Sequence, residues 1–150
     1  MSKENIVEYC FDDLRVGMSA YSEIKITAMR VSFFAAVSGD TQPLHLDEAY
    51  AKKTIFKGRI AHGMLVASLI SAVIGTKLPG SGTVLARMPA LLFKRPVRIG
   101  DVVRTEIVIT TLVHIPKRRV RLRATCTVNG KVVIEPEEEI EVTVPRYLRA

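Results

Sequence analysis

The sequence HGMLVASLISAVIGTK, residues 62–77, decides the fold. Apolar side chains occur on nearly every side of a helix drawn through it, and no Asp, Glu, Lys or Arg occurs before Lys77. A helix that is apolar all round belongs in the middle of a fold. The turn-forming sequence LPGSG, residues 78–82, then ends the helix. We therefore predict one long, buried central helix.

The chain that follows this helix is predicted to form strands. Residues 101–115 alternate in polarity, with one side made of Val103, Thr105, Ile107 and Ile109. Asn129-Gly130 is a strong signal for a tight hairpin between two further strands. The remaining predicted strands are residues 83–93, 118–128 and 131–144. One buried helix with several antiparallel strands predicts an α+β fold, a single domain over residues 1–150 with the sheet wrapped around the helix.

Three shorter elements are predicted before the central helix. Residues 21–27 form a strand with Ile24 and Ile26 on one side. Residues 28–38 form an amphipathic helix that ends at Gly39 and carries an apolar stripe at helical spacing, namely Met29, Phe33, Ala36 and Val37. Asp47 caps a second short helix that extends to Lys52 or Lys53. An open sheet of this kind leaves edges, and pairing two copies would cover one of them, so we expect a homodimer or a higher homo-oligomer.

Composition and charge restrict the class of protein. The longest uncharged apolar run, residues 64–76, is too short to span a bilayer, and residues 1–10 lack the pattern of a secretory signal. Two cysteines and three histidines give no disulfide framework and no metal-ligand spacing. We therefore expect a cytoplasmic protein with no membrane partner and no metal.

The net charge of +7 predicts that the protein attracts anions. Basic residues concentrate in residues 117–123, where they alternate with apolar ones as on a strand with one solvated face. Few aromatic residues are interleaved with them, so a stacking surface for single-stranded nucleic acid is not expected. Nucleic acid, a membrane surface and a phosphorylated small molecule are the anionic partners that this charge could serve, and a solvated strand face is the favoured interpretation of the basic residues.

The densest polar stretch in the chain is residues 38–47, SGDTQPLHLD. Gly39 and Pro43 place Asp40 at a helix end and His45 on an extended turn, and a chain that folds back there could point both side chains into one pocket. A carboxylate and an imidazole that share one water can remove a proton from it and return one elsewhere. The alternative is that Asp40 caps a turn and His45 is a satisfied polar residue. Spacing alone favours this second interpretation.

A second candidate site is the start of the central helix at Gly63. The first N–H groups of a helix are unpaired, and a glycine there leaves them open to a ligand. Such a donor could stabilise the charge that develops on a thioester oxygen. The alternative is a glycine required only for close packing.

Several motifs together resemble a known family. They are Ser38-Gly39-Asp40-x-x-Pro43-Leu44-His45, Tyr50-Ala51, Gly58-Arg59-Ile60-Ala61-His62-Gly63-Met64-Leu65 and Phe93-x-x-Pro96-Val97-x-x-Gly100-Asp101. In this order, from about residue 11 to residue 144, they resemble the MaoC-like, R-specific enoyl-CoA hydratases. The resemblance implies a hot-dog fold, a dimer with a continuous sheet, and reversible syn hydration of trans-2-enoyl-CoA to (R)-3-hydroxyacyl-CoA.

The same resemblance implies roles for individual residues. Asp40 and His45 hold and activate the water, with Asp40 as the base and His45 orienting the water and sharing the proton transfer. The N–H of Gly63 polarises the thioester carbonyl, and no cofactor is needed beyond the coenzyme A of the substrate. The sequence departs from the family motif at Gln42, where Asn is usual. This change bears on rate and substrate range more than on reaction class.

Two other functions fit parts of the sequence. A hot-dog thioesterase usually carries a catalytic carboxylate on its central helix, and residues 64–76 contain no Asp or Glu. A non-catalytic module that binds acyl-CoA or nucleic acid would account for the basic residues, but it would leave Asp40 and His45 idle. Hydration of an enoyl-CoA is therefore the favoured function.

Overall fold

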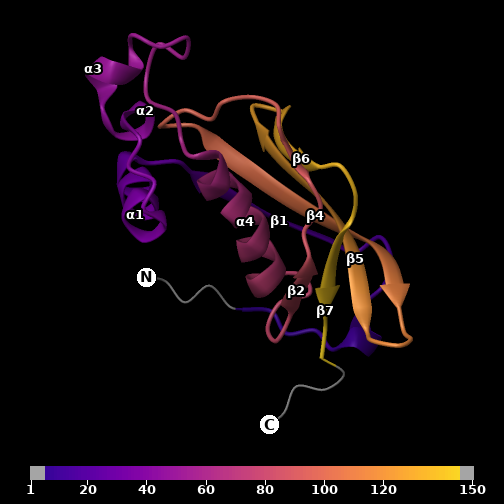
Figure 1. Ribbon diagram of the computed structural model, residues 1–150. Coiled ribbons are helices and arrows are strands. Elements are labelled where there is room, and N and C mark those ends of the chain that lie inside the picture. Colours follow the sequence, from indigo (N-terminus) through magenta and orange to yellow (C-terminus); the bar gives the residue numbers. More distant parts are fainter. Residues whose placement is uncertain (1–5, 146–150) are drawn as a thin grey trace.

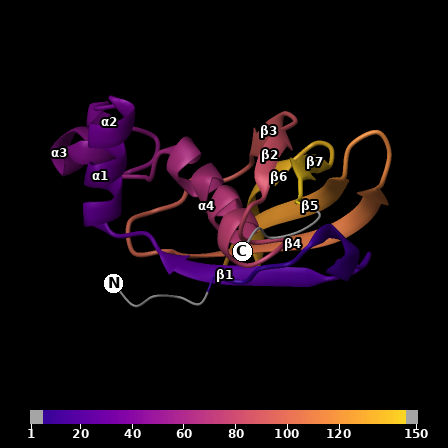
Figure 2. The ribbon, with the colours of Figure 1, turned by 90° about the horizontal axis from the view of Figure 1, so that it is seen from below.

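A long helix, α4 (Gly63–Thr76), lies against a strongly curved antiparallel sheet in the computed structural model, which describes residues 6–145 (Figures 1 and 2). The sheet order is β1-β4-β5-β6-β3, and β7 pairs with both β5 and β2. The strands are β1 (Ser19–Lys25), β2 (Val84–Arg87), β3 (Leu91–Phe93), β4 (Val102–Val113), β5 (Arg119–Val128), β6 (Lys131–Pro136) and β7 (Ile140–Thr143). An antiparallel sheet wrapped around one long helix is the hot-dog fold, as predicted.

Alternation of side chains explains the two longest strands, β4 and β5. The predicted inner side of β4, formed by Val103, Thr105, Ile107 and Ile109, is buried throughout. Asn129 and Gly130 join β5 to β6 with φ angles of 49° and 74°. A tight hairpin turn of this kind requires positive φ at both central positions, which confirms the predicted hairpin.

Two predicted strands are each divided in two. Residues 83–93 form β2 and β3, with Pro89 between them, and proline has no N–H to donate to a ladder. Residues 131–144 form β6 and β7, which are separated by the acidic residues Glu137, Glu138 and Glu139. Each break lets the strand change neighbours: β2 and β3 pair with β7 and β6 in turn. The sheet therefore curls around α4 rather than lying flat.

Helix α4 is buried on most of its surface but not on all of it. Val66, Ile70 and Val73 are almost fully buried within the core, and α4 lies against β4, β5 and β1. Met64 is 59% exposed, and the residues that follow it along the same side, Ser68, Ser71 and Ala72, are exposed too. Helix α4 is the predicted central helix, but one of its sides is exposed because the sheet curls around only part of it. No described helix has the length and apolarity that a membrane span requires.

A layer of three helices lies at one end of α4 (Figure 1). Helix α1 (Ala28–Ser38) has the predicted bounds, with the Thr27 side chain accepting from the Arg30 N–H and Gly39 ending the helix at a φ of 79°. Two one-turn helices follow, α2 (Pro43–Leu46) and α3 (Glu48–Ala51), and Asp47 caps α3 as predicted. A short 3-10 turn (Phe11–Asp13) precedes β1.

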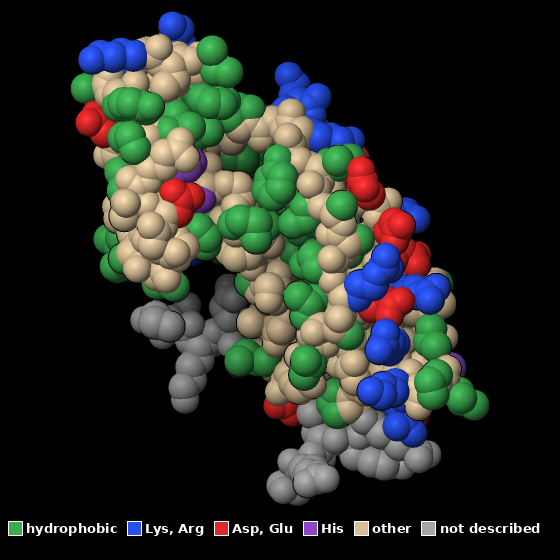
Figure 3. Space-filling view, in the orientation of Figure 1, with side chains coloured by type: hydrophobic (Ala, Val, Ile, Leu, Met, Phe, Trp, Pro, Cys, Tyr) green, Lys and Arg blue, Asp and Glu red, His purple; other side chains and the backbone are tan. Residues whose placement is uncertain are grey.

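The buried side of α1 is not the one that the sequence predicted. Val31 and Ala35 are buried, whereas the predicted apolar stripe of Met29, Phe33, Ala36 and Val37 is exposed. Hydrophobic side chains also gather over the middle of the face shown in Figure 3. Exposed apolar surface of this extent is typical of an interaction site.

Candidate active site

Asp40 and His45 are brought together by the chain that links α1 to α2. Gly39 turns the chain out of α1, and the Asp40 carboxylate then accepts a 3.3 Å hydrogen bond from the Gln42 N–H. This bond uses the backbone of Gln42, so it does not depend on that side chain. His45 lies in α2 and not on an extended turn, because Pro43 starts a helix well at its first position.

The two side chains meet a third, His62, which precedes α4. One ligand atom from each of Asp40, His45 and His62 lies within 4.8 Å of the others. Asp40 is exposed, whereas His45 and His62 are only 7% and 2% exposed. Figure 3 shows His and acidic side chains together beside a hollow between the helical layer and the rest of the molecule. Groups at this spacing can share one water through two ordinary hydrogen bonds.

The tautomer of His45 follows from its backbone partner. Nδ1 of His45 lies 2.8 Å from the carbonyl oxygen of Ile60. A carbonyl only accepts, so Nδ1 carries a proton and donates it. Nε2 of the neutral ring is then left with its lone pair free to accept a hydrogen from water. Asp40 and His45 therefore offer two acceptors to the same small volume.

His62 is the member of this group for which no role was predicted from the sequence. Its Nε2–H donates to the backbone carbonyl of Asp40 at 2.9 Å, and its ring stacks on that of His45 with 3.9 Å between centroids. Phe34 packs on His62 with its centroid 5.0 Å away. The sequence signal was present in the motif around Gly63, but nothing in the spacing indicated that residue 62 would reach Asp40.

The same three residues have ligand types that suit a metal ion. The lone pair of an imidazole lies in the ring plane, and zinc binds about 2 Å from the nitrogen. The planes of His45 and His62 are 29° apart with 3.9 Å between the ring centroids. One nitrogen of each ring already lies against a backbone carbonyl, at 2.8 Å and 2.9 Å, so each ring has one nitrogen left for a water or an ion.

A cavity of about 320 Å³ opens beside this group. Its lining includes His45, Gly63, Phe93, Lys94 and Arg95, whereas Asp40 lies outside it. The remaining lining residues are largely apolar: Phe56, Ile60, Ala61, Val66, Pro96, Val97 and Ile134. The structure therefore brings His45 and Gly63 to one cavity, and two basic residues stand on the same wall.

Gly63 is the first residue of α4, so its N–H has no partner within the helix. A Cβ added to Gly63 would lie 2.8 Å from the ring of Phe93. An alanine here would require the Phe93 ring to move, which fits the alternative interpretation of a glycine that allows close packing. Gly63 is also exposed, so the absence of a side chain leaves its N–H open to a ligand.

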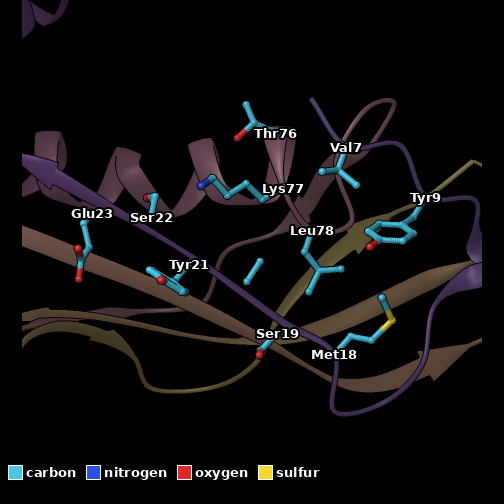
Figure 4. A pocket seen from close by; sticks show the side chains of 11 residues that line it. Val7, Tyr9, Met18, Ser19, Tyr21, Ser22, Glu23, Thr76, Lys77 and Leu78 are labelled. Carbon is cyan, nitrogen blue, oxygen red and sulfur yellow. The ribbon is translucent and has the colours of Figure 1, made fainter. Parts of the chain in front are cut away.

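A larger cavity of about 740 Å³ lies between β1, the N-terminal segment and the end of α4 (Figure 4). Its labelled side chains include Tyr9, Ser22 and Lys77, and its lining contains neither His nor Cys. Glu23 and Lys77 also line this cavity, but no histidine stands beside a carboxylate there as His45 stands beside Asp40. The smaller cavity is therefore the candidate active site.

The basic stripe on β5 has partners of its own. Arg119 and Arg121 both bind the carboxylate of Glu141 on β7, at 2.7 and 3.2 Å. The hydrogen bond from Arg119 is the main cause that lowers the pKa of Glu141. Two of the basic residues of this stripe therefore serve the sheet itself, as a solvated and paired strand face.

A hot-dog fold with a carboxylate and an imidazole beside a helix start is the arrangement expected of an enzyme that acts on acyl thioesters, and comparison with known proteins gives the family. Residues 15–141 match the family model of the MaoC like domain. The chain therefore belongs to the MaoC-like family.

The relatives are similar over most of their length. The chain is 47% identical to the (R)-specific enoyl-CoA hydratase of Rhodospirillum rubrum, covering 95% of this chain and 97% of that one. It is 43% identical to the 3-hydroxybutyryl-CoA dehydratase of Methylorubrum extorquens, over 88% and 83% of the two chains. Among solved structures, the unliganded R-hydratase PhaJ1 of Pseudomonas aeruginosa aligns with a TM-score of 0.85 at 42% identity, over 95% of this chain and 88% of that one.

Proposed function

We propose that this protein reversibly adds water to a trans-2-enoyl-CoA thioester to give the (R)-3-hydroxyacyl-CoA. The observation that carries the proposal is the meeting of Asp40 and His45 beside the cavity to which Gly63 opens. The names of the relatives support the substrate class, since the one from Rhodospirillum rubrum is an (R)-specific enoyl-CoA hydratase.

The proposed reaction uses the two acceptors in different ways. The water donates one hydrogen to the Asp40 carboxylate and the other to Nε2 of His45, which leaves an oxygen lone pair for the β-carbon. Asp40 takes the proton as the new C–O bond forms, and the same proton then goes to the α-carbon on the same face. The thioester oxygen gains enolate charge meanwhile, and the N–H of Gly63 stabilises it. No further reactant is needed.

Loss of enoyl absorbance tests the proposal directly. Crotonyl-CoA and longer enoyl-CoAs are the substrates, and chiral analysis of the product identifies the hydroxyl configuration. Asp40→Asn and His45→Gln should each lower kcat by about 10² or more, as expected for general acid–base groups. Their combined effect should be much smaller than the product of the two. Near-parental turnover by either folded variant would contradict the proposal.

The same assay separates hydration from thioester hydrolysis. Helix α4 contains no Asp or Glu, so it lacks the carboxylate expected of a hot-dog thioesterase. Free coenzyme A should therefore not accumulate when thiol release is followed with a chromogenic disulfide. Release of thiol at a rate comparable to the loss of enoyl absorbance would favour the thioesterase.

The proposed assembly is a homodimer. The stripe on α1 formed by Met29, Phe33 and Val37 is exposed, as is Met64 on α4, and among the described strands β3 pairs on one side only. A second copy would cover this apolar surface and extend the sheet at its edge. Light scattering should then give twice the 16.6 kDa chain mass, and Phe33→Asp should shift it toward the monomer. Free thiols at Cys10 and Cys126 fit a reducing cytoplasm.

A further inference from the structure

We propose that His62 is a positioning residue that holds Asp40 and His45 at their places around the reacting water. The inference rests on the proposed hydration and adds a third side chain to it. His62 itself touches neither the water nor the thioester in this scheme. It acts through the backbone of Asp40 and through the ring of His45.

The first step of the argument is the attachment of Asp40. Asp40 is exposed and follows the end of α1, and its other hydrogen bonds in the described part of the chain reach only Ser38 and Gln42. The bond from Nε2–H of His62 crosses 22 positions of sequence and ties the Asp40 carbonyl to the start of α4. Without it, the Asp40 loop would keep its local turn but lose its connection to the helix that carries Gly63.

The second step is the orientation of His45. Its Nδ1 is fixed by the Ile60 carbonyl, but one hydrogen bond leaves the ring free to rotate about that bond. Stacking against His62 at 3.9 Å removes this freedom. His62 is in turn packed by Phe34, so its own plane is fixed. The direction of Nε2 of His45 therefore depends on the ring of His62.

The third step is the polar atom that His62 leaves unused. Its Nε2 donates to a carbonyl, so Nδ1 is an acceptor, and this atom is fully buried without a partner among the described residues. A buried polar atom without a partner destabilises a protein. A phenylalanine would stack on His45 and fill the same space without that cost. A histidine at this position is therefore explained by its bond to Asp40 and not by packing.

Substitution of His62 separates positioning from packing. His62→Phe keeps the stacked ring but removes the bond to Asp40, so kcat should fall about tenfold to a hundredfold, the scale of a 1 Å misplacement of reacting groups. KM should stay within about twofold, and the melting temperature should be unchanged or raised. His62→Gln can restore a donor to the Asp40 carbonyl and should recover part of the kcat. In an Asp40→Asn background, His62→Phe should have little further effect.

His114→Phe is the matched control. His114 also packs edge-on against an aromatic ring, that of Phe11, and it is not among the residues that line the candidate site. This variant should keep the parental kcat. If His62→Phe lowers the melting temperature and leaves kcat unchanged, His62 has only a structural role and the proposal is wrong.

Hydrogen exchange of the backbone provides a readout that does not need catalysis. Residues 39–42 should exchange faster in His62→Phe than in the parent, because the Asp40 loop has lost its link to α4. Unchanged exchange in this segment would overturn the proposal even if hydration by the parent were not observed. Absence of hydration by the parent, with faster exchange in the variant, would refute the proposed function and leave the link between His62 and Asp40 intact.

Discussion

Gly63→Ala tests whether a backbone donor at the start of α4 serves the reaction. The new methyl group would lie 2.8 Å from the ring of Phe93, closer than real contacts allow. Phe93 is 52% exposed, so its ring can swing outward. This movement costs less free energy than the roughly 1–3 kcal/mol that overpacking a closed core costs. Alanine in place of glycine within a helix also gains about 0.5–1 kcal/mol. These effects offset each other, so we expect a change in stability of about 1 kcal/mol or less.

The effect on rate should be much larger. Either the methyl group or the displaced ring of Phe93 would stand where the thioester oxygen approaches the N–H of Gly63. A displacement of about 1 Å at such a contact costs on the order of 10² in rate, or about 2.7 kcal/mol of barrier. The oxygen is most negative in the transition state, so kcat should fall sharply and KM should change little.

Steady-state hydration of crotonyl-CoA by four proteins distinguishes the effect of the new methyl group from the effect of the displaced Phe93 ring. Gly63→Ala, Phe93→Ala, the double variant and Gly75→Ala are compared at equal oligomeric state. Gly75 is the matched control, because it lies in the same helix and no atom lies within 4 Å of an added Cβ. Gly80 is unsuitable as a control, because a Cβ there would meet the Val7 carbonyl at 2.0 Å. If the ring alone is responsible, the double variant should match Phe93→Ala. A Gly63→Ala protein that turns over like the parent would refute the reasoning.

Two further predictions concern charge. Because Lys94 and Arg95 line the candidate site, KM for crotonyl-CoA should rise with ionic strength, and a pantetheine thioester should show little such dependence. The double variant Lys94→Gln/Arg95→Gln should flatten the dependence of KM on salt, whereas Arg123→Gln, on the exposed side of β5, should preserve it. Equal slopes in the parent and both variants would contradict a role of Lys94 and Arg95 in binding the substrate. Glu141→Gln should lower the free energy of unfolding at pH 7, since the Arg119 hydrogen bond lowers the folded-state pKa of Glu141 from 4.5. The stability that this carboxylate contributes is complete above pH 4.5 and is lost as the pH falls through the lowered pKa. The urea midpoints of the parent and Glu141→Gln should therefore converge in acid. A difference between the midpoints that stays constant with pH would contradict this contribution.

The elements that the sequence predicted well are those fixed by local patterns. Helix α1 has its predicted bounds because Thr27 and Gly39 are cap residues that act within one turn. The inner side of β4 was predicted correctly because alternation along one strand decides which side is buried. The hairpin at Asn129-Gly130 needs only two adjacent residues with positive φ. Each of these depends on chemistry within a few positions.

The features that were missed depend on what lies across the molecule. The sequence predicts an apolar stripe of Met29, Phe33 and Val37 on α1, but periodicity does not say whether such a stripe meets the core of the same chain, and here it is exposed. The contact between His62 and Asp40 joins positions 22 apart, and stacking of two histidines has no sequence period. The place of Asp40 and His45 was predicted from a motif, whereas the geometry that makes them partners came from the fold.

The bond from Nδ1 of His45 to the Ile60 carbonyl has a consequence for evolution. Every residue type presents the same carbonyl, so substitution of Ile60 leaves the proton of His45 where it is. The backbone at residue 60 is itself held by a bridge to Arg98, and the next N–H, that of Ala61, donates to the Val97 carbonyl at 2.7 Å. Point mutation of residue 60 therefore leaves the tautomer of His45 unchanged. Insertions or deletions in residues 52–59 would change it, because they would shift the register of that bridge. The identity of residue 60 therefore does not decide the tautomer of His45, whereas the length of the segment before it does.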